Sequence, residues 1–285
     1  CLSSTVLDKQ PDDIVAFLLD TACCPRLCAS LCNAIRNSDD GQKKLEMLLS
    51  QNLFLIPLDN CNEWFRYHDA LLQRVRQTDP ARARLLWRRT VEWLLAHGQV
   101  QEAIAQIVQK QDWPWLANVL ATHGNNLIHG GYHLPVLAWL DALPAKQTKD
   151  NAQLQMLRIW GRFFANRLEQ LEPLLSNVEN LLDRPLADSA PDTEGALGLQ
   201  SEIALIRSYL ARSRSDEKRA SDLTQQVLAD IDHTRIPLKS VTYYGLGLDD
   251  YGKGDLNGAE EALTFSVHYG QLERKPSTVL SSGGL

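Results

Sequence analysis

The chain has 285 residues, a hydrophobic content of 44%, a charged content of 22% and a net charge of −6. This composition is ordinary for a globular protein that is long enough to bury a core and to hold two domains. The acidic balance excludes a general attraction to nucleic acid or to an anionic membrane. No apolar run reaches the roughly 18–20 residues that cross a bilayer, so we expect no membrane partner. Because Cys1 stands first instead of Met, we expect a portion of a longer protein.

The cysteines near the amino terminus allow more than one interpretation. Cys24, Cys28 and Cys32 recur at every fourth position and would line one face of a helix. Three thiolates could bind a metal, but zinc sites usually take four ligands with hairpin-like spacing. Free cysteines also pack as small apolar side chains or act as redox sensors. Packing is the simplest interpretation, and unpaired cysteines favour a reducing compartment such as the cytoplasm.

The first third of the chain predicts a winged helix. Pro11 and the acidic residues after it suit a first helical turn, and apolar spacing predicts helices over 6–19, 26–35 and 42–51. The period then changes to that of two short strands, 53–58 and 64–67, separated by a turn. Pro57 favours an exposed edge strand, which a two-stranded wing provides. A further helix is expected over 69–75.

Asp79 and Pro80 then form a strong helix-start signal, an N-cap followed by proline at the first helical position. From the helix predicted over 81–97 onward, the chain alternates helices and short turns. A pattern of turn, aliphatic residue and small residue recurs at 98–104, 166–172 and 254–260, with a weaker copy around Ala220. Each copy marks the second helix of a hairpin, and such hairpins stack into a solenoid.

The predicted fold class is therefore mainly α: a small winged-helix segment with a β-hairpin, followed by a tetratricopeptide-like α-solenoid of helical hairpins. The expected divisions are the winged-helix segment 1–78, a helical arm 79–150, a tetratricopeptide-like sensor array 151–270 and a tail 271–285. Residues 189–195 are expected to form a loop within the array.

One glycine-rich stretch and one cluster of arginines could bind a phosphate or another anion, but each has a simpler structural interpretation. Residues 247–253 follow the first positions of a phosphate-binding loop, but Gly254 replaces the hydroxyl that would ligate magnesium. An inter-helix turn is the better interpretation. A basic cluster could bind a nucleotide, nucleic acid or an acidic neighbouring domain, although a solvated helix face is simpler. The cluster consists of Arg74, Arg76, Arg82, Arg84, Arg88 and Arg89.

Aromatic and histidine clusters are also ambiguous. Trp113, Trp115 and Trp139 could wall a ligand pocket, but their spacing also suits helix packing. His123, His129 and His133 could form a metal site, yet the glycines between them favour loops. No set of residues offers itself for catalysis, and we assign no metal. These side chains are most simply structural.

Several stretches resemble a single family: residues 6–11, 17–21, 26–34, 52–59 and 64–72. They resemble the segment that follows the ATPase core in large ATP-dependent LuxR-type transcription regulators. These are signal-transduction ATPases with numerous domains, of the maltose-regulon-activator type. The resemblance is specific over about residues 5–145 and looser to about residue 270.

Tyr67-His68-Asp69 is also similar to the Met-His-Asp motif of related immune ATPases, with Tyr67 in place of Met. The resemblance implies that His68 contacts the ADP phosphate in the resting full-length protein, with Asp69 and Arg66 beside it. A histidine donor at a helix start suits a phosphate, and a neighbouring carboxylate can fix the ring. The alternative is a core-facing histidine satisfied by Asp69 or by the backbone.

The resemblance implies the central signal-sensing and coupling portion of a bacterial ATP-dependent transcriptional activator. Its superhelix would bind an unknown small-molecule or protein inducer and relay it to the ATPase and helix-turn-helix domains of the same protein. This portion would be no enzyme and would hold no cofactor; the full-length protein would bind ATP or ADP, contact DNA through another domain and self-associate when activated. A stand-alone tetratricopeptide-like interaction scaffold is the alternative.

Overall fold

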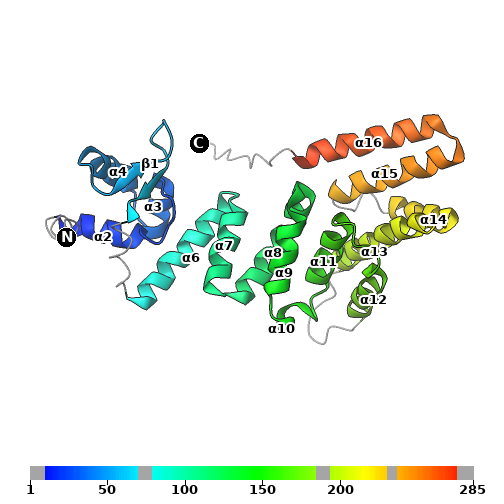
Figure 1. The fold of residues 1–285 in the computed structure, drawn as a ribbon, viewed down its shortest axis with the longest axis horizontal. Helices are drawn as coiled ribbons and strands as arrows, with labels where there is room; N and C mark the ends of the chain where they lie inside the picture. Colours follow the sequence, from blue (N-terminus) through cyan, green and yellow to red (C-terminus); the bar gives the residue numbers. More distant parts are fainter. Residues whose placement is uncertain (1–9, 70–78, 184–192, 230–235, 275–285) are drawn as a thin grey trace. The chain divides into compact units, whose positions relative to one another are not determined.

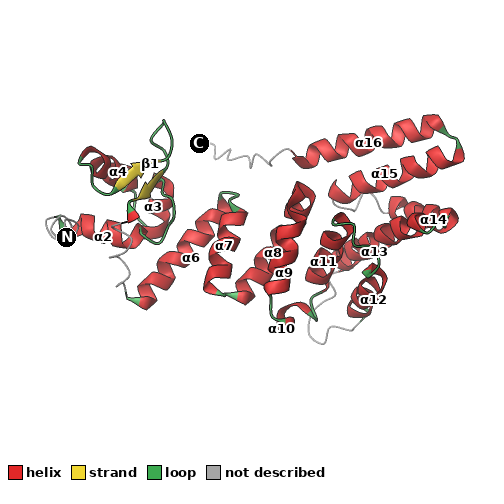
Figure 2. Cartoon of the chain, in the orientation of Figure 1, coloured by secondary structure: helices red, strands yellow, loops and turns green. Residues whose placement is uncertain are grey.

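The computed structural model describes residues 10–69, 79–183, 193–229 and 236–274. The described chain is mainly helical, with a small two-stranded sheet (Figures 1 and 2). It divides into two compact units, Cys1–Gln111 and Asp112–Leu285. The predicted divisions after residues 78, 150 and 270 are not tested by this separation and stay predictions.

The first unit begins with a winged-helix arrangement, in which three helices precede an antiparallel pair of strands. These elements are α2 (Asp12–Thr21), α3 (Ala29–Arg36), α4 (Gly41–Ser50), β1 (Leu55–Pro57) and β2 (Phe65–Tyr67). In the sheet, Leu55 pairs with Tyr67 and Pro57 with Phe65. The predicted winged helix and its β-hairpin are confirmed.

Two helix starts differ from the prediction. Helix α2 begins at Asp12, because Pro11 is its extended N-cap residue and proline disfavours helical backbone just before it; residues 6–9 of the predicted helix lie outside the described part. The second begins at Ala29, because Leu27 pairs with Phe65 through two hydrogen bonds of 2.7 and 2.8 Å. The prediction that Cys24, Cys28 and Cys32 line one helix face is therefore wrong. Only Cys32 lies inside α3.

The core of the winged helix joins its helices to the sheet. Its side chains come from all three helices, from the bridge residue and from β2, and each is at most 2% exposed. They are Ile14, Phe17, Leu18, Leu27, Leu31, Ile35, Leu45, Leu48, Phe65 and Tyr67. Because β2 buries alternate residues, its remaining side chains face solvent.

The same unit contains the first helical hairpin, α6 (Pro80–Ala96) and α7 (Val100–Lys110). The Asp79 side chain accepts hydrogen bonds from the main-chain N–H groups of Ala81 and Arg82, at 3.3 and 3.4 Å. The predicted cap is thus confirmed. The predicted helix over 69–75 lies outside the described residues, apart from the helical Asp69.

The described part of the second unit consists of helices (Figure 1). Its elements are α8 (Trp113–Leu127), η2 (Ile128–Tyr132), α9 (His133–Ala142), α10 (Ala145–Thr148), α11 (Ala152–Phe164), α12 (Leu171–Leu182), α13 (Thr193–Ser213), α14 (Glu217–Ala229), α15 (Ile236–Lys253) and α16 (Leu256–Arg274). No described helix is long and apolar enough to cross a membrane.

The predicted repeat corresponds to four hairpins: α6/α7, α11/α12, α13/α14 and α15/α16. Each turn contains a residue with a left-handed backbone, φ between 56° and 81°: Gly98, Asn166, Ser215 or Gly254. Each second helix carries a buried side chain in its first four residues: Ala103, Leu171, Ala220 or Ala259. The short turn and the buried anchor explain why the pattern recurs in the sequence.

Three further expectations need correction. Residues 247–253 are the last turns of α15, not an inter-helix turn, which begins only at Gly254. His123, His129 and His133 lie on α8, η2 and α9 instead of on loops, since the helices continue through a wide turn kinked at Gly131 (φ 93°). Of the predicted loop 189–195, residues 189–192 lie outside the described part, while α13 begins at Thr193.

Candidate functional site

The strand-to-helix junction at His68 is formed as expected. The His68 main-chain N–H donates to the carbonyl oxygen of Phe54 at 2.8 Å, which extends the pairing of the hairpin by one residue. Asp69 already has helical backbone. The hairpin therefore fixes the main chain at His68.

The three residues predicted to contact nucleotide share an exposed location. The side chains of Arg66, His68 and Asp69 are all exposed, whereas Phe65 and Tyr67 are buried. Since side chains alternate along a strand, Arg66 and His68 fall on the same face. The side chains of Arg66 and His68 are thus both exposed to solvent at one end of the sheet. The alternative interpretation, a His68 that faces the core, is wrong.

Tyr67 holds this end of the hairpin against α2. Its hydroxyl hydrogen-bonds to Thr21 Oγ1 at 2.7 Å, while the Thr21 hydroxyl donates to the carbonyl of Phe17, also at 2.7 Å. Burial raises the pKa of Tyr67 well above its usual value, so the phenol stays neutral. Tyr67, in the position of the motif's methionine, therefore fixes the strand next to His68.

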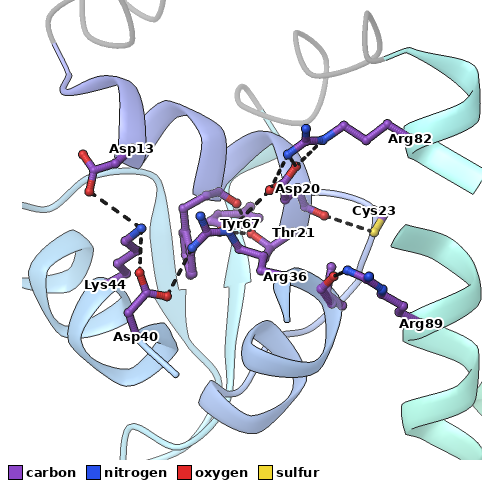
Figure 3. A network of polar contacts seen from close by, with 12 residues as sticks. Asp13, Asp20, Thr21, Cys23, Arg36, Asp40, Lys44, Tyr67, Arg82 and Arg89 are labelled. Atoms are coloured by element: carbon purple, nitrogen blue, oxygen red, sulfur yellow. Dashed lines mark hydrogen bonds and ion pairs between the residues drawn. The ribbon is translucent and has the colours of Figure 1, made fainter. Parts of the chain in front are cut away.

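Asp20, beside Thr21, connects the winged helix to the first hairpin. Its side chain is 6% exposed, and the carboxylate receives Arg82 Nε and Nη2 of α6 at 2.9 Å each (Figure 3). Arg36 Nε of α3 donates to it at 3.4 Å. Arg89 of α6 also reaches the winged helix, donating to the carbonyl of Ile35 at 2.8 Å. We call these contacts of Asp20, Ile35, Arg82 and Arg89 the arm joint.

The arm joint corrects the interpretation of the basic cluster. Arg82 is exposed, as the solvated-face interpretation expects, but both Arg82 and the half-buried Arg89 also bind acceptors of the winged helix. The considered alternative, an acidic neighbouring domain, fits Arg82, whose acceptor is the carboxylate of Asp20. Arg84 and Arg88 are exposed, and the remaining two arginines of the cluster lie outside the described residues.

A second chain of ion pairs holds α2, α3 and α4 together. Asp40 receives Arg36 Nη1 at 3.2 Å and Lys44 Nζ at 2.8 Å, and Lys44 lies 3.7 Å from Asp13 (Figure 3). The hydrogen bond from Lys44 lowers the pKa of Asp40. Arg36 thus links this chain to Asp20, so the joint is continuous with the charges inside the winged helix.

Arg26 makes a second link, from the winged helix to α7. Its guanidinium pairs with Glu102, donates to Gln99 Oε1 at 2.9 Å and lies 4.3 Å over the ring of Trp64. Trp64 in turn packs edge-on against Trp93 of α6, with ring centroids 6.3 Å apart. The β1–β2 hairpin is therefore tied to both α6 and α7.

The second unit contains a cavity of about 460 Å³ between α12, α13 and α14. Arg207 of α13 lines it, donating to Glu172 Oε1 at 2.9 Å and to Glu179 Oε2 at 2.8 Å. The Arg207 guanidinium lowers the pKa of Glu179. The other lining residues are half polar and half apolar: Asn180, Asp183, Gln200 and Gln226, and Leu182, Ile203, Ala204 and Leu223. The sequence showed no sign of this cavity, because its residues come from three helices.

The aromatic and histidine candidates fall elsewhere in the second unit. Trp113, Trp115 and Trp139 are half-buried. His129 packs against Trp160, with ring centroids 5.5 Å apart, and Trp160 Nε1 donates to the buried Glu202 at 2.6 Å. In the described part of the chain, no group of three or more His, Cys, Asp and Glu side chains is placed to hold a metal.

The fold and this site define a winged-helix domain that precedes an array of helical hairpins. Residues 3–83 match the family model of the MalT winged helix domain. The HTH-type transcriptional regulator MalT of Serratia proteamaculans is 26% identical over 249 residues, 85% of this chain and 27% of that protein. MalT of Cronobacter sakazakii is 26% identical over 231 residues, 80% of this chain and 25% of that protein.

The serine/threonine-protein kinase PknK of Mycobacterium tuberculosis is 24% identical over 232 residues, 80% of this chain and 20% of that protein. The chain thus spans about a fifth to a quarter of the curated relatives it matches. It carries a MalT-type winged helix domain and is similar to MalT-type regulators along most of its length. The predicted resemblance to this group of regulators is confirmed.

Proposed function

We propose that this chain is the coupling and sensing portion of an ATP-dependent transcription regulator of the MalT type, acting in the cytoplasm. The observation that carries the proposal is the exposed His68 beside Arg66, next to the buried Tyr67, whose hydroxyl is hydrogen-bonded to Thr21. In the longer protein, these side chains contact the phosphates of a nucleotide bound by an ATPase domain. This portion itself binds no cofactor alone and performs no catalytic step.

The chemistry of the exposed face suits an anionic ligand. The Arg66 guanidinium carries N–H donors that match phosphate oxygens, and the His68 ring carries a further N–H donor. Asp69 follows His68 directly and can orient its ring. Hydrogen bonds to a charged partner contribute about 1.5–3 kcal/mol, enough to bias a two-state switch.

The arm joint gives a physical route from nucleotide to array. Tyr67 binds Thr21, the next residue after Asp20, and Asp20 binds Arg82 of α6. A change in the position of the β1–β2 hairpin is therefore transmitted to α6, the first helix of the α6/α7 hairpin. In this proposal the resting protein holds ADP, and the contacts of the arm joint stay formed. The active protein self-associates and contacts DNA through a helix-turn-helix domain.

The cavity between α12, α13 and α14 is our candidate inducer site. Arg207 is already paired with Glu172 and Glu179, so the site presents no large excess of charge. Asn180, Gln200 and Gln226 offer donors and acceptors, which favours a small polar ligand. By linkage, this ligand acts only through its different affinity for the two states of the protein.

The test is the variant His68→Ala in the longer protein, with Asn60→Ala in the exposed turn of the same hairpin as the matched control. We expect His68→Ala to purify with less bound ADP and to show higher basal transcription. The control keeps both properties, because Asn60 lies in the turn, away from the junction. Unchanged ADP content and basal output in His68→Ala would refute the nucleotide contact and favour the stand-alone scaffold.

A further inference from the structure

Cys23 and Cys24 form a pair of thiols next to the arm joint. Their sulfur atoms lie 3.8 Å apart in the segment that connects α2 to α3. Cys23 is exposed, whereas Cys24 is 3% exposed. One thiol is thus open to a reagent in solution, and the second lies behind it. This arrangement is that of a reactive cysteine next to a resolving cysteine.

Thr90 of α6 touches both sulfur atoms. Its Oγ1 lies 3.4 Å from Cys24 Sγ and 3.8 Å from Cys23 Sγ, and the Thr90 hydroxyl donates to the carbonyl of Leu86 at 3.0 Å. The hydroxyl oxygen is therefore free to accept from a thiol. The hydrogen bond between the two cysteines lowers the pKa of Cys23 and raises that of Cys24. Cys23, the exposed thiol, therefore loses its proton more readily than the buried Cys24.

We propose that Cys23 and Cys24 are an oxidisable dithiol, which a peroxide converts to a disulfide and thereby loosens the contact between the winged helix and α6. The Cys23 thiolate attacks one oxygen of hydrogen peroxide, and the O–O bond breaks. With one proton taken up, this gives a sulfenic acid and water. Cys24 then attacks the Cys23 sulfur, its S–O bond breaks, and the proton of Cys24 leaves in a second water. Two thiols are oxidised and one peroxide is reduced to two waters.

The geometry makes this modification reversible. Consecutive Cα atoms lie about 3.8 Å apart, below the roughly 4.4–6.8 Å that disulfides usually span. A strained and exposed disulfide is readily reduced, as a regulatory bond requires. In a disulfide the two sulfur atoms lie about 2 Å apart, much closer than in the dithiol. At least one of them must therefore move relative to Thr90 Oγ1.

Oxidation therefore acts on the arm joint. Cys23 Sγ also hydrogen-bonds to the carbonyl of Asp20 at 3.6 Å, so the thiol pair and the Arg82 ion pair share one residue. A disulfide removes a contact to α6 beside the place where Arg82 and Arg89 bind. We expect the first turns of α6 to lose protection from hydrogen exchange, while the second unit is unchanged.

The test treats this 285-residue chain with hydrogen peroxide and follows its thiols by alkylation and peptide mass. We expect Cys23 and Cys24 to lose reactivity together, with the loss of two hydrogens, and to recover with dithiothreitol. Cys61, an exposed cysteine in the wing turn, is the matched single thiol and reacts more slowly. In Cys24→Ala, Cys23 proceeds to the sulfinic acid, whereas Cys61→Ala behaves as the parent.

Two outcomes would overturn the proposal. The first is a Cys23 that is oxidised to the sulfinic acid in the parent chain, or that reacts no faster than Cys61. The second is a disulfide that forms without any loss of exchange protection in α6. Because these measurements need neither nucleotide nor inducer, they fail or succeed independently of the proposed function.

Discussion

The two units each contain a buried carboxylate bound by an arginine, but the arginines differ in their access to water. In the arm joint, Asp20 is bound by Arg82, whose side chain is 55% exposed. In the second unit, Asp249 is bound by Arg212, whose side chain is only 15% exposed. The Arg212 guanidinium also reaches Thr224 Oγ1 at 2.7 Å and the carbonyl of Gly245 at 3.1 Å.

This difference separates a joint that can open from a permanent cross-link. If Arg82 leaves Asp20, water solvates its guanidinium and Arg36 remains beside the carboxylate, so the cost is small. If Arg212 loses Asp249, a charge stays inside a three-helix contact without its counterion, which is expensive. We therefore expect regulation at the arm joint and rigidity within the hairpin array.

The largest expected effect is that of Asp249→Ala. Removing one member of a buried ion pair costs about 3–5 kcal/mol, and the partial exposure of Arg212 places this variant near the lower figure. Urea unfolding of the second unit measures the loss. Asp250→Asn, whose carboxylate lies 3.9 Å from Lys253 Nζ, is the control and changes little.

The double variant Arg212→Met with Asp249→Leu sharpens this test, because it removes both charges at once. It is expected to recover part of the stability that Asp249→Ala loses. An Asp249→Ala protein as stable as the parent would show that the pair in the second unit is not a cross-link.

Arg82→Ala is expected to have a smaller effect on global stability, about 0–1 kcal/mol, because the pair is half exposed and screened by water. Its effect is local: the first turns of α6 exchange their amide hydrogens faster. Arg84→Ala, an exposed arginine on the same helix, is the matched control and leaves exchange unchanged. If Arg82→Ala lost as much global stability as Asp249→Ala, the arm joint would be as much a cross-link as the Arg212–Asp249 pair, and the difference between the two regions would be contradicted.

The smallest effect is a pH dependence in the cavity of the second unit. The hydrogen bond from Arg207 lowers the pKa of Glu179 from its ordinary value of 4.5. A lowered carboxylate pKa contributes stability above pH 4.5, and this contribution is lost as pH falls through the pKa of the folded state. Glu179→Gln should therefore flatten the decline of melting temperature below that pH. Glu260→Gln, an exposed carboxylate on α16, should leave the decline as steep as in the parent.

Much of the fold could be predicted from local signals. Asp79 before Pro80 indicates a helix start, and a turn followed by a small residue indicates each helical hairpin. Both patterns depend only on residues that are close together in the sequence. The Leu27–Phe65 bridge could not be predicted, since its partners are far apart in the chain and Leu27 sits in an apolar stretch that also suits a helix. For the same reason, the expectation that Cys24, Cys28 and Cys32 line one face of a helix was wrong.

The candidate site shows the same division. The strand-to-helix junction at His68 was predictable, because a change of period and a family motif meet at that residue, while the nucleotide contact of His68 stays a prediction. Asp20 was not, because a single acidic residue at a helix end gives no sign that Arg36 and Arg82 will reach it. The cavity around Arg207 and the Cys23–Thr90 contact depend on packing between helices, and the sequence pattern is silent about such contacts.

The most direct test of the account is the rate at which the longer protein releases a fluorescent ADP analogue, compared between the parent and His68→Ala. If His68 contributes one hydrogen bond to a charged phosphate, its loss costs about 1.5–3 kcal/mol, and release becomes roughly 10–100-fold faster. Asn60→Ala releases the analogue at the parent rate. Equal rates for the parent and His68→Ala would contradict the central claim, that the exposed end of this hairpin senses the nucleotide.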